Sequence, residues 1–364
     1  MKILQVINSL ATGGAEKLLL ETLPLYRKKG IEMDVLVLNG TDTSFMKQLK
    51  ALNCCVVYSL GTASVYNPLL IFKLIPFLKK YSLVHVHLFP AQYWVVMAKL
   101  ISFSKVKLIF TEHCTSNRRL ENKIFKFIDQ HCYRFYDGVV AISKEINEIV
   151  LKHSKLNISK IHTIENGVNL NTIRKAPSLD KKDILPSFKE EDKLLIQVAG
   201  FRAQKDQTTL IKAMQLLPLE VKLVLAGEGV LKKKCQDLVE TLNLKERVVF
   251  LGLRMDIPQL LKTADVVVLS SKYEGLSLSS IEGMAAGKPF VASDVPGLRE
   301  VVKGAGILFP MSNVKQLAKE ISKLLDSPKH YQFVANACQK RAAKYDIYKM
   351  VDQHINIYKN MYEA

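Results

Sequence analysis

The sequence lacks any pair of cysteines separated by two residues, although it contains six cysteines. A zinc site would be expected to show such pairs, so neither a zinc site nor a disulfide framework is indicated. It also lacks a run of about 20 apolar residues, the length that a membrane-spanning helix requires. The most apolar windows, residues 68–78 and 88–101, are interrupted by Lys, Pro and Gln.

A signal peptide and low-complexity tracts are also missing. The N-terminus enters an expected strand at Lys2 without a charged and apolar leader. We therefore expect a cytoplasmic protein with reduced thiols.

The chain has 364 residues, 48% of them hydrophobic and 24% charged, which suits a soluble protein with two domains. Its net charge of +18 is uneven. Residues 1–175 carry 24 Lys and Arg against 12 Asp and Glu, and the remainder carries 28 against 22. A basic first half is compatible with nucleic acid, an anionic membrane or a phosphorylated acceptor, and equally with dispersed lysines on a solvated surface.

Strand-like runs alternate with helix-length segments throughout. Seven such runs precede the polar stretch 171–192, which contains two prolines and is typical of a linker, and six follow it. Two successive series of βα units predict an α/β protein with two doubly wound parallel sheets. The expected domains are residues 1–175 and 176–346. The expected strands are 2–7, 33–39, 54–58, 83–87, 106–111, 138–142, 160–164, 194–199, 221–226, 248–251, 265–270, 289–293 and 306–308.

The most informative segment is residues 273–289, with the sequence YEGLSLSSIEGMAAGKP. It follows a buried parallel strand and continues as a helix from about Leu278. Glu274 then lies in a loop at the carboxyl end of a strand, where open α/β sheets bind ligands. Glu282 lies about one turn into the helix, and the free backbone N–H groups near Leu278 and Ser279 can bind an anion. The alternative is that both glutamates are surface residues.

Three further strand ends in the second half carry candidate ligand-binding residues. Arg202 and Lys205 follow the first strand and can reach one diphosphate, Arg with a fork of donors and Lys as a point charge. Gly227 follows the next strand, and Met255 lies after the one beyond it. Each segment could instead be an ordinary surface loop or tight turn.

In the first half, Gly13 and Gly14 precede a long amphipathic helix and offer another amide-lined pocket. They do not form a Gly-x-Gly-x-x-Gly string, so dinucleotide binding is poorly supported. His113 lies at a strand end, as a catalytic-centre candidate or a buried structural histidine. His85 and His87 alternate on one strand face, but without a carboxylate or Cys at matching spacing they suit packing or cleft lining better than metal.

Segment 273–289 resembles the glutamate–seven residues–glutamate motif of retaining glycosyltransferases of family 4. The resemblance covers nearly the whole chain, most strongly residues 194–302. It implies the GT-B architecture, in which two Rossmann-like domains face a cleft and the last helix, here 347–361, packs back on the first domain. The chain departs from the family pattern in two strings. After the first strand of the second domain, Phe201 stands between the Gly and Arg202, the gap to Lys205 is shorter, and Asp206 replaces a Gly. At the end of the first domain, Glu165 replaces a Pro.

The resemblance also implies roles for individual residues. The first Glu of the motif, Glu274, would contact the transferred sugar, and the second, Glu282, would hold the ribose hydroxyls. His113 would lie close to the transferred sugar. The remaining candidates are donor-binding residues around the phosphates and base: Arg202, Lys205, Leu278, Ser279, Gly13, Gly14, Gly227 and Met255.

The expected function is therefore transfer of a hexosyl or N-acetylhexosaminyl group from a UDP- or GDP-sugar to an acceptor hydroxyl, with retention. We expect no cofactor and no metal, since no Asp-x-Asp string stands at an expected strand end and cationic side chains can replace the ion. The favoured acceptor is a lipid-linked glycan of bacterial surface polysaccharide assembly, met at the inner face of the plasma membrane. The basic, aromatic segment 118–127 could lie on anionic lipid or pack into its domain.

Alternatives remain open. Within enzymes, the chain could be a GT-B sugar-nucleotide epimerase or a transferase with a small soluble acceptor. A basic nucleic-acid-binding protein is the rival from another class, but no recognisable reading motif supports it.

Overall fold

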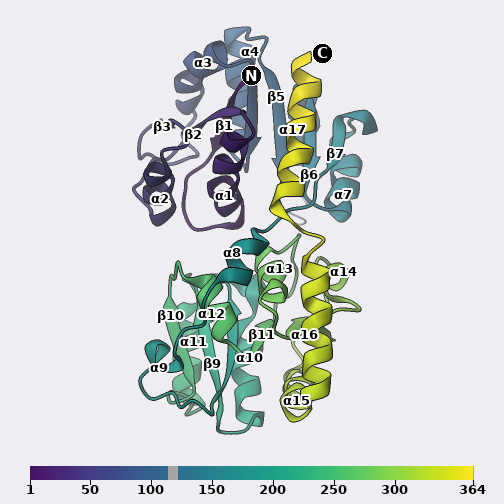
Figure 1. Cartoon of the computed structure of the whole chain (residues 1–364). Helices are drawn as coiled ribbons and strands as arrows, with labels where there is room; N and C mark the ends of the chain where they lie inside the picture. Colours follow the sequence, from purple (N-terminus) through teal and green to yellow (C-terminus); the bar gives the residue numbers. More distant parts are fainter. Residues whose placement is uncertain (114–121, 364) are drawn as a thin grey trace. The chain divides into compact units, whose positions relative to one another are not determined.

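The computed structural model describes residues 1–113 and 122–363 and divides the chain into two compact units. Unit 1 comprises residues 1–167 together with 347–364, and unit 2 comprises residues 168–346. The first boundary therefore lies a few residues before the one expected after residue 175. Both units are α/β structures built on a parallel sheet (Figure 1).

Unit 1 contains a seven-stranded parallel sheet in the order β3-β2-β1-β4-β5-β6-β7. Its central strands are nearly continuous apolar runs because both faces of the sheet are covered. Every expected strand is present, and β3 is shorter than the apolar run 54–58 suggested. The strands are β1 (Lys2–Ile7), β2 (Glu32–Val37), β3 (Val57–Ser59), β4 (Leu83–His87), β5 (Lys107–Glu112), β6 (Gly138–Ala141) and β7 (Ile161–Thr163).

Helices cover both faces of this sheet, and right-handed crossovers decide which helix lies on which face. One face carries α1 (Gly14–Lys28), α2 (Ser44–Leu52) and α17 (Ile347–Glu363), the yellow helix of Figure 1, which packs against α1. The other face carries α3 (Leu70–Lys80), α4 (Ala91–Ser102), α6 (Lys123–Tyr133) and α7 (Lys144–Ser154). Helix α17 thus completes unit 1 with residues from the far end of the sequence.

Unit 2 contains a six-stranded parallel sheet in the order β10-β9-β8-β11-β12-β13. The strands are β8 (Lys193–Val198), β9 (Val221–Ala226), β10 (Val248–Gly252), β11 (Val266–Leu269), β12 (Phe290–Ser293) and β13 (Ile307–Phe309). The helices between and after them are α10 (Gln207–Ala213), α11 (Lys232–Thr241), α12 (Ile257–Thr263), α13 (Leu278–Ala285), α14 (Arg299–Val302), α15 (Val314–Asp326) and α16 (Pro328–Ala342).

The expectation of a linker over residues 171–192 is wrong. This stretch belongs to unit 2, where α8 (Leu170–Lys175) packs on α12 and α13, and α9 (Lys181–Ile184) follows. Buried apolar side chains at Ile173, Ile184 and Phe188 anchor it to the unit. They are spaced too widely among polar residues and prolines to give a periodic signal.

Each sheet has one topological switch point, where the direction of strand addition reverses. It lies between β1 and β4 in unit 1 and between β8 and β11 in unit 2. Connections leave in opposite directions from the carboxyl ends of such neighbouring strands and leave a crevice there, the usual ligand site of open α/β sheets. Among the described residues, no helix is both long and apolar enough to cross a membrane.

Candidate active site at two strand ends

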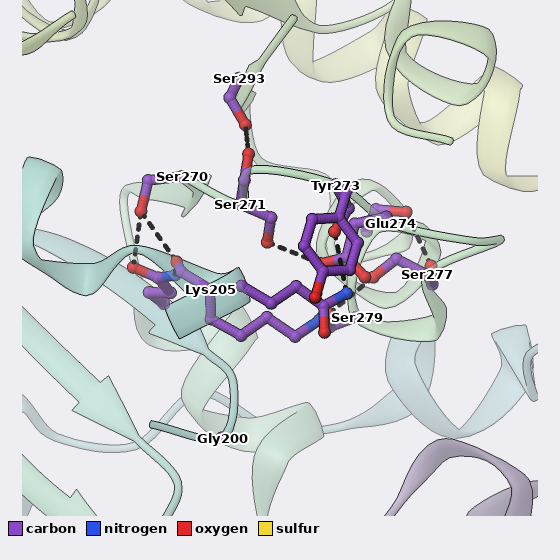
Figure 2. Close-up of polar contacts among 12 residues, drawn as sticks. Gly200, Lys205, Ser270, Ser271, Tyr273, Glu274, Ser277, Ser279 and Ser293 are labelled. Atoms are coloured by element: carbon purple, nitrogen blue, oxygen red, sulfur yellow. Dashed lines mark hydrogen bonds and ion pairs between the residues drawn. The ribbon is translucent and has the colours of Figure 1, made fainter. Parts of the chain in front are cut away.

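An ion pair occupies the switch point of unit 2. Lys205 follows β8, Glu274 follows β11, and the Lys205 Nζ lies 2.5 Å from the Glu274 Oε1 (Figure 2). The Ser271 hydroxyl donates to the same carboxylate oxygen at 2.6 Å. Glu274 is only 5% exposed, so the alternative of a surface glutamate is excluded. The sequence singled out both residues but gave no sign of their contact, which joins positions 69 residues apart.

Neighbouring backbone contacts hold the two loops together. The Gln204 Nε2 donates to the Tyr273 carbonyl at 2.9 Å, and the Lys272 N–H donates to the Gln204 carbonyl at 2.7 Å. Beneath them, the buried Gln197 of β8 donates to the Lys205 carbonyl at 3.0 Å. The Ser270 hydroxyl donates to the Asp206 carbonyl at 2.9 Å. The position of Lys205 is thus fixed by hydrogen bonds from the ends of both β8 and β11.

Asp206 stands where the family that this chain resembles has a glycine, and the structure shows how aspartate fits there. Its φ of +43° lies in the left-handed region, which glycine adopts freely and aspartate tolerates. The Thr209 hydroxyl donates to the Asp206 Oδ2 at 2.8 Å, and the Ser312 hydroxyl does so at 3.0 Å. A conformation suited to Gly is therefore held here by local hydrogen bonds to Asp.

The N-terminus of α13 lies in the same loop as Glu274. The Ser277 side chain makes no capping bond to the backbone; its hydroxyl instead lies 3.0 Å from that of Ser279. The Ser280 and Ile281 N–H groups donate to the Ser277 carbonyl. The N–H groups of Leu278 and Ser279 take part in no backbone hydrogen bond of the described residues, so they are available to an anion.

Glu282 lies on the buried part of α13 and is 5% exposed. Its helix can approach the sheet closely because of Gly283, where an added Cβ would lie 2.8 Å from side-chain atoms of Phe290 and Val267. The alternative of a surface position is therefore excluded for Glu282 as well.

The loops after β8 and β9 pack backbone against backbone. A Cβ on Gly227 would lie 2.2 Å from the Ala199 carbonyl oxygen, and Gly227 has a φ of +146°. The Phe201 N–H donates to the Glu228 carbonyl at 3.0 Å. Glycine at 227 is therefore required by both conformation and space.

The other two donor-binding candidates of unit 2 lie on the surface. Arg202 is exposed at the start of the short loop before Lys205, and Met255 is exposed after β10. Both follow strands of the sheet half that contains β8. The Arg202 carbonyl accepts from the Lys205 N–H at 2.9 Å, but within the described residues no contact of the Arg202 or Met255 side chain joins it to the Lys205–Glu274 pair.

In unit 1 a small cavity of about 40 Å³ lies at the switch point. His113, half-buried just after β5, lines it together with residues of β1, β4, α1 and α17. The His113 Nε2 lies 3.2 Å from the Nδ1 of His87, so this histidine is hydrogen-bonded. Burial and the neighbouring His354 lower its pKa to about 4, so the ring is neutral near pH 7.

Gly13 and Gly14 are exposed at the first turn of α1. A Cβ on Gly13 would lie 2.3 Å from a carboxylate oxygen of Glu16. This carboxylate occupies the positive end of the helix and competes with any phosphate there.

No cluster of three or more His, Cys, Asp and Glu side chains suited to a metal ion occurs within residues 1–113 and 122–363. His85 and His87 are used in hydrogen bonds, His85 to Tyr358 and Thr111, and His87 to His113 and Gln5. Of the basic segment 118–127, residues 118–121 lie outside the described part of the chain.

Solved structures with the same architecture are glycosyltransferases of the GT-B class. The structure of HepE from Anabaena, solved with UDP and glucose, matches with a TM-score of 0.84 over 99% of this chain and 100% of that one, at 22% identity. This likeness identifies the fold.

Sequence comparison gives the family. The model for glycosyl transferases group 1 matches residues 180–341, and that for Glycosyltransferase Family 4 matches residues 12–172. The chain belongs to the glycosyltransferases of family 4, as the motif around Glu274 and Glu282 indicated.

Two relatives of similar sequence have names that specify different acceptors. An N-acetylgalactosamine-N,N'-diacetylbacillosaminyl-diphospho-undecaprenol 4-alpha-N-acetylgalactosaminyltransferase of Campylobacter jejuni is 25% identical over 363 residues, covering 94% of this chain and 95% of the relative. An N-acetyl-alpha-D-glucosaminyl L-malate synthase of Bacillus anthracis is 28% identical over 291 residues, covering 76% of this chain and 74% of the relative.

Proposed function

We propose that this glycosyltransferase moves a hexosyl or N-acetylhexosaminyl group from a UDP- or GDP-sugar to an acceptor hydroxyl, with retention and without a metal ion. The observation that carries the proposal is the ion pair between Lys205 and the buried Glu274. It belongs to the same loop region as the Leu278 and Ser279 N–H groups of α13, which make no described backbone hydrogen bond. An ammonium group and backbone donors suit the departing diphosphate, and a carboxylate suits sugar hydroxyls.

The ion pair defines how the two side chains work together. A carboxylate removed from water needs charged or hydrogen-bonding partners, and Lys205 and Ser271 both supply this to Glu274. Lys205 has two further donor positions once it contacts Glu274. In the proposed complex it contacts the carboxylate and a phosphate oxygen together, and Glu274 accepts a hydrogen bond from a sugar hydroxyl.

The remaining roles follow from position. Arg202 adds a second cation toward the diphosphate, and the N–H groups of Leu278 and Ser279 complete the anion site. Glu282 accepts from the ribose hydroxyls, and the loops at Gly227 and Met255 line the nucleoside. Because the Arg202 side chain is exposed, we expect it to contact the diphosphate only after the donor has bound.

Turnover of a panel of UDP- and GDP-sugars, followed by mass spectrometry, tests the proposal. Glu274→Gln keeps the shape of the side chain but removes its charge, and should reduce kcat on the order of a hundredfold, as loss of an electrostatic contact at a reacting centre does. Glu240→Gln, at an exposed glutamate of α11, is the matched control and should be fully active. Full activity of Glu274→Gln would overturn the assigned role, and an inverted product in NMR of the anomeric proton would overturn retention.

For the acceptor, we propose a lipid-linked glycan of bacterial surface polysaccharide assembly. The Campylobacter relative, whose name specifies a diphospho-undecaprenol acceptor, supports this choice and aligns over nearly the whole chain. The Bacillus anthracis relative supports the second candidate, a small water-soluble acceptor such as the malate in its name.

A surface feature of unit 1 favours the lipid-linked acceptor. Helix α6 exposes Ile124 (70%) and Phe127 (64%) together with Ile128, so this apolar face does not pack into the unit. Lys126 is exposed beside it. Apolar side chains flanked by lysine suit the interface of an anionic bilayer.

Helices α3 and α4 extend this surface. They pack on each other on the face of the sheet that also carries α6, and α4 contacts α6. Residues 70–107, which include both helices, contain six lysines and no Asp or Glu. We therefore propose that this face of unit 1 rests on the inner leaflet of the plasma membrane. The exposed apolar residues of α3, α4 and the turn after α4 are Phe72, Met97, Leu100, Ile101 and Phe103.

Sedimentation with liposomes separates the acceptor candidates. The protein should bind vesicles rich in acidic lipid and be released as salt rises, and the substitutions Ile124→Ser and Phe127→Ser should weaken binding without changing nucleotide affinity. Leu219→Ser and Val230→Ser remove exposed apolar side chains of unit 2 and are the matched control. Equal binding to neutral and acidic vesicles, or none, would refute the membrane contact and favour the soluble acceptor.

A further inference from the structure

A hydrogen-bonded chain of side chains leads from β1 and β4 to His113. Gln5 and His87 are its links; Gln5 belongs to no sequence motif, and the sequence indicated only packing or cleft lining for His87. The Gln5 Oε1 lies 2.8 Å from the His87 Nε2, and the His87 Nδ1 lies 3.2 Å from the His113 Nε2. Gln5 is 1% exposed, a buried polar residue within an otherwise apolar strand.

The orientation of the Gln5 amide follows from its other contacts. Its Nε2 lies 3.3 Å from the Met33 Sδ, which accepts hydrogen bonds weakly and donates none, and 3.5 Å from the Tyr358 hydroxyl. If the amide nitrogen and oxygen exchanged places, the Gln5 oxygen would face the Met33 sulfur, and neither of these two atoms could donate a hydrogen bond to the other. The Tyr358 hydroxyl oxygen can accept a hydrogen bond from the Gln5 Nε2, and it also lies 2.7 Å from the His85 Nδ1.

The protons on the two rings are then determined in turn. Because the Gln5 Oε1 can only accept, His87 carries its proton on Nε2 and donates it there. The His87 Nδ1 is then an acceptor, so the His113 Nε2 carries a proton and donates it to His87. Neutral His113 has one ring nitrogen left, Nδ1, with a lone pair.

We infer that Gln5 and His87 are positioning residues that hold His113 as the neutral tautomer with its proton on Nε2, so that its Nδ1 accepts a hydrogen bond from a hydroxyl of the transferred sugar. The inference rests on the proposed function for the identity of the ligand. A ring held in this state has no donor and no charge to offer a phosphate. At His113 it therefore favours a hydroxyl over a phosphate group.

The surroundings keep this arrangement neutral. His85 and His354 face the same cluster from β4 and α17, and burial lowers the pKa of each below its ordinary value. The ring centroids of His85 and His87 are 4.3 Å apart, so a charge on either would repel a charge on the other. The described titratable side chains that line the cavity are these four histidines, Tyr26 and Tyr358.

Nitrogen-15 NMR of histidine-labelled protein reads the tautomer directly, with His113→Asn used to assign the signals. The unsubstituted protein should show His113 protonated on Nε2 near pH 7. His87→Phe, which has no acceptor, should convert His113 to a mixture of tautomers. His87→Asn can place its Oδ1 where Nδ1 was and should restore the original pattern. A His113 protonated on Nδ1, or a pattern unchanged in His87→Phe, would overturn the inference.

A double-mutant cycle measured through kcat distinguishes a positioning role of His87 from a merely structural one. His87→Phe should lower kcat about tenfold, the effect of roughly one lost hydrogen bond, and change the KM for the donor little. In a His113→Ala background the same substitution should have no further effect. Additive losses would overturn the inference. If no sugar donor is turned over at all, the proposed function fails while the NMR result still decides the tautomer.

Discussion

Acidification should destabilise unit 1 through its histidine cluster. His85, His87, His113 and His354 all have lowered pKa values, chiefly because burial penalises the charged ring, and for His113 and His354 the pKa falls to about 4. A lowered histidine pKa means that the unfolded chain binds protons first. Stability is therefore fully present above pH 6.5 and falls as pH drops below 6.5, and the part due to His113 and His354 levels off below about pH 4.

The magnitude follows from the shift of one residue. At pH 5, about 1.5 units below the ordinary histidine pKa, an unfolded His354 is protonated and the folded one is not. The difference is about 2 kcal/mol for this side chain at about 1.4 kcal/mol per unit. The other three histidines act in the same direction. Asp34 and Asp256, whose pKa values are lowered by hydrogen-bonded partners, stay ionised over this interval and do not contribute.

The single tryptophan makes the measurement specific to unit 1. Trp94 lies on α4 and donates to the Val65 carbonyl at 2.8 Å, so its fluorescence reports unfolding of that unit. Urea unfolding at pH 7 and pH 5 should show a loss of at least about 2 kcal/mol. His354→Leu should reduce this loss by about 2 kcal/mol, whereas His330→Leu, at an exposed position of α16, should not. The same pH dependence in His354→Leu and the parent would refute the reasoning.

Three further outcomes are expected. Glu282→Ala should weaken UDP or GDP binding in calorimetry by about 1.5–3 kcal/mol, and unchanged affinity in a folded variant would reject its role at the ribose. Activity should persist in excess chelator; loss that magnesium or manganese restores would show that Lys205 and Arg202 do not suffice for the leaving group. Asp206→Val should cost about 1–2 kcal/mol in urea unfolding because a β-branched residue resists a φ of +43°, whereas Asp206→Gly should be milder. Equal costs would argue against the left-handed conformation.

The strands were predictable because buried parallel strands are short, continuous apolar runs, as at Val266–Leu269. Their alternation with helices and the motif at 273–289 were enough to give the fold and the family. The segment 171–192 was not predictable as part of unit 2, because a few isolated apolar anchors such as Phe188 carry no periodicity. Packing against α12 and α13 decided its place instead.

The candidate site was predictable as residue types but not as contacts. Nothing in the sequence pairs Lys205 with Glu274, since the pairing depends on β8 and β11 being neighbours across the switch point. The contact of His87 with His113 was missed for the same reason, because it joins neighbouring strands β4 and β5. The sequence did contain one sign of this cluster, because the polar Gln5 interrupts an apolar run. In the structure Gln5 is paired in register with His85 of β4.

The return of α17 to unit 1 has a consequence for the order in which the protein forms. During synthesis, residues 1–167 emerge first but lack the helix that brings His354 and Tyr358 to their cluster. Residues 168–346, by contrast, form a unit contiguous in sequence, which can fold as soon as it leaves the ribosome. The unit made first is thus completed last, and the histidine cluster around its cavity gains His354 only after translation of α17.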